Sequence, residues 1–162
     1  MAVSLIVEDG TGIANANSYV SEAEYLTYWT DRGNATAIAI TGDTLKSLLI
    51  QATDYVENVY YEKWLGDRLT LTQALEFPRV INLIDVEVPD RLKKACFELA
   101  LKANSASLLT DVEQRIIKEK VAVIETTYSE YSNQLTQYTN VYELVKPYLL
   151  NQSTTSVKVV RT

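Results

Sequence analysis

An apolar stripe along residues 89–106 constrains the fold more than any other feature of this 162-residue chain. Apolar side chains recur there at spacings of three and four, which is the pattern of a helix with one buried face. The stripe consists of Leu92, Ala95, Cys96, Leu99, Ala100, Ala103 and Ala106. Pro89 lies at or just before the first turn, where a missing N–H costs nothing, and Asp90 adds negative charge at the positive end of the helix dipole. The sequence therefore predicts a long helix whose opposite face, from Arg91 to Ser105, is polar.

The stretch before this helix predicts a rigid corner. Phe77 precedes Pro78, and a residue before proline is driven out of the helical region into an extended conformation. A short helical turn at residues 72–75 is therefore expected to end at Phe77. A Phe-Pro pair is not a catalytic signature, so we interpret Phe77, Pro78 and Arg79 as a structural corner packed on the 89–106 helix.

Two further helices are expected in the first half of the chain. The first begins at Ser21, which forms a capping box with Glu24, and ends near Gly33. Residues 35–41 are small and predict a linker.

The second of these helices is expected to be capped by Asp43 or Thr44 and to end around Tyr61. Residues 80–88 are mostly apolar and predict an extended segment that crosses the core.

The region after the long helix contains the main β signal. Residues 116–128 are rich in β-branched side chains, and their side chains alternate in the pattern of a strand with two faces. This predicts a strand that could pair with residues 115–118 as a hairpin. Residues 129–139 are polar and predict a surface loop. Asn140 is expected to cap a last helix, which Pro147 kinks or shortens.

The C-terminal residues resemble an isolated strand. A polar linker, residues 151–156, separates them from the last helix, and the segment itself is Val157, Lys158, Val159, Val160 and Arg161. A lone strand has an unpaired edge, so we predict that this tail pairs with a sheet edge of another subunit. The alternative is a frayed chain end.

The residue types present exclude most catalytic sites. The chain has no histidine, so it lacks the commonest general base and the Ser-His-Asp and Cys-His arrangements. Its one cysteine, Cys96, lies on the apolar stripe and is interpreted as an inert core residue. Gly10 and Gly12 lack the third glycine or the lysine of a nucleotide-binding loop. We therefore expect no enzyme activity, no metal site and no cofactor.

The charge balance argues against tight nucleic-acid binding. The chain carries 15 basic and 21 acidic residues, for a formal net charge of −6, and it has no basic run. Phosphate neutralisation by Lys and Arg supplies most of the affinity for nucleic acid. The eleven tyrosines are therefore interpreted as core or interface residues in preference to base-stacking ones.

A series of short motifs follows a fixed order along residues 5–150. The motifs are residues 8–12 (EDGTG), 14–21 (ANANSYVS), 52–56 (ATDYV), 73–79 (QALEFPR), Val88-Pro89 and residues 95–100 (ACFELA). In this order the chain resembles a family of small tailed-phage proteins that are often labelled DnaT-like single-stranded-DNA-binding proteins. They are also similar to the head-to-tail connector adaptors of long-tailed phages. Phe77 stands where the family often has tryptophan.

The resemblance implies a structural virion protein. It predicts a connector adaptor that forms a ring, commonly of twelve copies, between the portal and the next tail-proximal or head-closure protein. Genomic double-stranded DNA would pass through the ring without tight binding, and the protein would lie in the virion neck after assembly in the host cytoplasm. The tail at residues 157–161 would contact the portal or a neighbouring copy. The alternative is a single-stranded-DNA-binding replication accessory.

The expected architecture is mainly α. We predict a small helical bundle over residues 1–150 with a short β-hairpin or strand element, followed by an extended C-terminal tail over residues 151–162. No transmembrane segment or signal peptide is expected.

Overall fold

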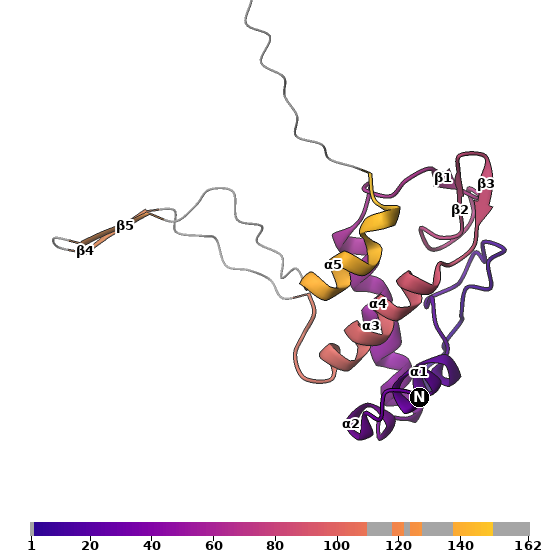
Figure 1. Ribbon diagram of the computed structural model, residues 1–162, viewed down its shortest axis with the longest axis horizontal. Coiled ribbons are helices and arrows are strands. Elements are labelled where there is room, and N and C mark those ends of the chain that lie inside the picture. The colour runs from indigo at the N-terminus through magenta and orange to yellow at the C-terminus, as the bar shows by residue number, and fades with distance from the viewer. Residues whose placement is uncertain (1, 110–117, 122–123, 128–137, 151–162) are drawn as a thin grey trace, which may run out of the picture.

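The computed structural model describes residues 2–109, 118–121, 124–127 and 138–150. Its helices are α1 (Glu22–Thr30), α2 (Ala35–Ile38), α3 (Gly42–Val59), α4 (Asp90–Ala103) and α5 (Thr139–Val145), and the 3-10 turn η1 (Lys146–Tyr148) follows α5. The strands are β1 (Asp67–Arg68), β2 (Arg79–Ile81), β3 (Ile84–Val86), β4 (Lys118–Val121) and β5 (Ile124–Thr127). The predicted fold class, mainly α with a small β element, is confirmed (Figure 1).

The core lies between the two longest helices, α3 and α4, which pack along each other (Figure 1). Apolar side chains from both helices, among them Leu49, Val56, Leu92 and Leu99, are fully buried. α5 covers α4 and adds the buried side chains of Val141 and Val145. Within the described parts of the chain, no helix combines the length and the apolar character needed to cross a membrane.

The local helix signals predicted α1 and α4 correctly. Ser21 caps α1, and its backbone N–H donates to the Glu24 carboxylate at 2.8 Å in the expected capping box. Gly33 ends this region with a φ of +63°, which glycine adopts without strain. Pro89 is the N-cap of α4, as its position in the sequence indicated.

Several helix boundaries differ from the prediction, among them the end of α4, which lies at Ala103 and not at Ala106. Residues 35–38 form the short helix α2 and not a linker, because the Asn34 side chain accepts a hydrogen bond from the N–H of Ala37 at 3.1 Å. α3 begins at Gly42, after Thr41, so neither Asp43 nor Thr44 is its cap.

Residues 80–88 were predicted to cross the core as an extended segment. Instead, they fold into a hairpin on the surface. β2 pairs antiparallel with β3, and Val80 lies opposite Asp85. The turn between them places Asn82 and Leu83 at positive φ angles of 52° and 65°. Leu83 is 96% exposed, so the hairpin tip points into solvent. β1 pairs with the other side of β2 and completes a sheet of order β1-β2-β3.

The later elements match the prediction in type and differ in detail. β4 and β5 pair antiparallel, with Lys118 opposite Thr127 and Val121 opposite Ile124, so Lys118 takes part in the hairpin, while residues 115–117 of the predicted partner lie outside the described residues. The N-cap of α5 is Tyr138, not Asn140, and Pro147 lies in η1, directly after the helix. The predicted tail at residues 157–161 lies outside the described residues.

Candidate functional site

The predicted corner is part of the core. Phe77 is fully buried, and its ring meets Tyr19, Trp64 and Tyr148 edge-on at centroid distances of 6.5, 5.1 and 6.2 Å. The Phe77–Pro78 peptide bond is cis. The expected helical turn at residues 72–75 is absent: these residues form bends.

The polar side chains of the corner bind one another and the nearby backbone. Arg79 is 7% exposed, and its guanidinium donates to the Glu76 carboxylate at 2.5 Å and to the carbonyl of Leu65 at 2.8 Å. Arg68 pairs with the same carboxylate at 2.6 Å. Gln73 donates to the carbonyl of Pro78 at 2.9 Å. The motif at residues 73–79 therefore builds the fold, since its functional groups are used internally.

The glycine loop near the N-terminus is filled by its own carboxylate. Glu8 is 3% exposed and accepts hydrogen bonds from the N–H groups of Gly10, Gly12 and Ile13 at 3.0, 2.8 and 2.9 Å. Such a cluster of amides is a common anion site. Here Glu8 occupies it, so the loop is not a candidate for phosphate binding.

The exposed face of α4 carries three cations that lack acidic partners. Among the side chains that the structure describes, Arg91 and Lys94 make no hydrogen bond, ion pair or ring contact, and they lie one turn apart. Lys102 continues the same face and contacts an aromatic ring, not a carboxylate. Most other described cations are engaged, for example Lys46 with Glu22 and Asp43. We call Arg91, Lys94 and Lys102 the basic face of α4.

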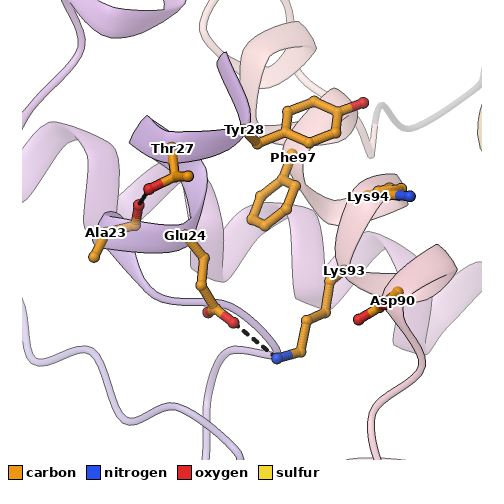
Figure 2. A pocket seen from close by; sticks show the side chains of 8 residues that line it. All are labelled: Ala23, Glu24, Thr27, Tyr28, Asp90, Lys93, Lys94 and Phe97. Carbon is orange, nitrogen blue, oxygen red and sulfur yellow. Dashed lines mark hydrogen bonds and ion pairs between the residues drawn. The ribbon is translucent and has the colours of Figure 1, made fainter. Parts of the chain in front are cut away.

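A hollow of about 380 Å³ lies beside this face, between α1 and α4 (Figure 2). Lys93 and Lys94 line it from α4, and Tyr28 and Phe97 present their rings to it with centroids 4.9 Å apart. Lys93 also pairs with Glu24 across the hollow at 2.8 Å. Burial alone would raise the pKa of Glu24, but hydrogen bonds from Lys93 and Ser21 bring this pKa below its ordinary value.

Aromatic rings flank α4 on both sides, each with a cation. On one side, the guanidinium carbon of Arg32, which follows the end of α1, lies 3.4 Å from the centroid of the Tyr28 ring. Before α5, the Tyr138 ring lies 5.1 Å from the Lys102 ammonium. Burial and the hydrogen bond to Glu98 raise the pKa of Tyr28, so its hydroxyl stays protonated at neutral pH. Rings next to cations form the kind of surface on which nucleobases stack.

A second hollow, of about 500 Å³, lies on the other flank of α4. Arg91 lines it together with Lys146, Glu143 and the apolar side chains of Leu65 and Leu149. The unpaired Arg91 thus lies in the same depression as a cation from η1.

The described residues contain no group of three side chains placed to hold a metal ion.

Comparison with known proteins identifies the family. The model of a family described as "Putative DnaT-like ssDNA binding protein" matches residues 3–162. The chain belongs to this family. No curated protein and no solved structure matches the chain.

The family match overturns the predicted role as a head-to-tail connector adaptor. It supports the alternative from the sequence, a protein that binds single-stranded DNA, better than a structural connector. The partners predicted with the connector role, namely the portal, a tail-proximal protein and a twelve-copy ring, stay untested, as does the predicted location in the virion neck.

The sequence did not reveal the site, because the tyrosines were interpreted from the charge balance of the whole chain. Lys102 approaches Tyr138 only through the packing of distant segments, and Phe97 reaches Tyr28 in the same way. A local signal did exist for one pair, since Arg32 follows Tyr28 by four residues and lies just beyond the end of α1. Cys96 is buried as expected, and burial raises the pKa of its thiol.

Proposed function

We propose that this protein binds single-stranded DNA through the basic face of α4. The observation that carries the proposal is the match of residues 3–162 to a family described as binding single-stranded DNA. The arrangement of Arg91, Lys94 and Lys102 supports it, because cations without acidic partners can neutralise phosphates at little cost. The proposal involves no catalysis and no cofactor.

The basic face has the dimensions of a short strand of nucleic acid. A helix rises about 1.5 Å per residue, so Arg91 and Lys102 are separated by roughly 16 Å along α4. Phosphates of one strand would contact the three cations in turn, while a base lies against the flanking ring of Tyr28. Asp90 and Glu98 lie on the same helix, and their carboxylates repel the phosphates of the DNA strand. We therefore expect dissociation constants on the order of 10⁻⁶ to 10⁻⁴ M and not tighter.

The salt dependence of binding follows from the number of cations. Three phosphate contacts to single-stranded DNA predict a slope of about −2 in the plot of log K against log salt concentration. Raising the salt from 50 to 200 mM is then expected to weaken binding about 20-fold. Fluorescence anisotropy of a labelled oligonucleotide measures both quantities.

Lys94→Gln is expected to weaken binding and to make the slope shallower by about 0.7, because one phosphate contact is lost. Lys46→Gln is the matched control: it removes the same charge from α3, where Lys46 already pairs with Glu22 and Asp43. The control should bind like the unmodified protein. Equal losses in the two variants would place the DNA elsewhere on the molecule, and absence of binding at 50 mM salt would refute the proposed function.

A further inference from the structure

We propose that the hollow between α1 and α4 admits one unpaired nucleobase of the bound strand. This inference rests on the proposed function and assigns a role to a part of the surface that the basic face alone does not use. Phosphates would stay on Arg91, Lys94 and Lys102, and one base would turn into the hollow against Phe97 and Tyr28 (Figure 2).

The shape and walls of the hollow suit a flat, apolar ring. Its volume of about 380 Å³ lies within the range of small-molecule pockets. Phe97 is 5% exposed, and it forms the back of the hollow in Figure 2, below the ring of Tyr28. Most of the surface area that lines the hollow is apolar. Ala23 and Thr27, which are both exposed, lie at its rim.

The charges in the hollow favour a neutral ligand over an anion. Glu24 and Asp90 line the hollow together with Lys93 and Lys94, so its formal charge is balanced. A phosphate placed there would meet two carboxylates, whereas a base is neutral and has donors and acceptors on its edge. The Glu24–Lys93 pair supplies an acceptor and a donor for that edge. A base within a duplex is stacked and paired, so the hollow discriminates in favour of single strands.

The experiment compares three nucleic acids of equal length: a mixed-sequence single strand, a single strand that carries abasic sugars throughout, and a duplex. All three present a phosphate backbone, but only the first presents unpaired bases. The unmodified protein is expected to bind the base-bearing strand about tenfold more tightly than the abasic strand, which corresponds to the stacking of one base. The abasic strand measures the contribution of the phosphate contacts alone.

Filling the hollow is expected to abolish this preference. Thr27→Phe places a large ring at the rim of the hollow, and Ala23→Leu does so with a smaller side chain at the neighbouring position. Both side chains are exposed, so the fold should be retained, which thermal melting checks. Thr44→Phe, at an exposed position of α3, is the matched control and should keep the tenfold preference. Affinity for the abasic strand and the salt slope should stay unchanged in all three variants.

The outcomes separate the two proposals. If the unmodified protein binds base-bearing and abasic strands equally, or if both filled variants keep the preference, the base pocket is refuted while DNA binding by the basic face stands. If the protein binds neither strand, the proposed function fails and the base pocket fails with it.

Discussion

Replacing Phe77 by alanine is expected to lower the free energy of unfolding by about 3–5 kcal/mol, the usual cost of removing a buried aromatic ring. Phe77 is fully buried and joins three parts of the chain, since its ring touches Tyr19 near the N-terminus, Trp64 after α3 and Tyr148 in η1. No neighbouring side chain can fill the resulting cavity without moving away from its other contacts. Urea denaturation followed by tryptophan fluorescence measures the shift of the midpoint.

Leu71→Ala is the matched control for this prediction. Leu71 lies six residues before Phe77 in the same loop region and is 99% exposed. Its replacement should change the free energy of unfolding by no more than about 0.5 kcal/mol. An unchanged midpoint for Phe77→Ala would mean that the ring is exposed in solution, and an interface role for the corner would then be the better interpretation.

The sequence predicted those elements of the fold whose signals are local. The capping box of Ser21 and Glu24 and the apolar stripe of the long helix depend on spacing alone. The capping box was correct, and the stripe was correct up to the end of α4 at Ala103, whereas Ala106 lies beyond the helix and is exposed. The β2–β3 hairpin was missed because its turn contains Asn82 and Leu83 and no glycine. A leucine at a φ of +65° is uncommon, so turn chemistry gave no warning that the apolar run reverses direction.

The candidate site was only partly visible in the sequence. The polar face of α4 could be predicted, because Arg91, Lys94 and Lys102 follow helical spacing. The sequence could not predict whether those cations have acidic partners, since ion pairs such as Lys93 with Glu24 join residues that lie 69 positions apart. The net charge of −6 describes the average of the chain and hides this difference between paired and unpaired cations. Tertiary structure therefore decides which charges a ligand can use.

The stability of the protein is expected to fall as the pH rises from about 4.5 to about 7. Burial is the main reason that the pKa of Glu57 rises from 4.5 to about 7. The hydrogen bond from Tyr19 lowers this pKa in part, and the nearby charge of Glu76 raises it further. In the unfolded chain Glu57 has its ordinary pKa, so between these two pH values the native state holds a proton that the unfolded state has released. The free energy of unfolding should decrease by about 3 kcal/mol across this window and stay constant above it.

The absence of histidine from the sequence makes this window easy to examine, because histidine is the side chain that ordinarily titrates there. Glu57→Gln mimics the protonated carboxyl at every pH. This variant should match the unmodified protein near pH 4.5, lack the decrease, and be the more stable of the two at pH 8. Glu62→Gln, at an exposed position just after α3, is the control and should retain the decrease. Urea midpoints at intervals between pH 4.5 and 8 give both profiles. A stability that rises with pH in this window would mean that Glu57 is ionised in the native state and that its bonds to Tyr19 and to the N–H of Glu76 outweigh its burial.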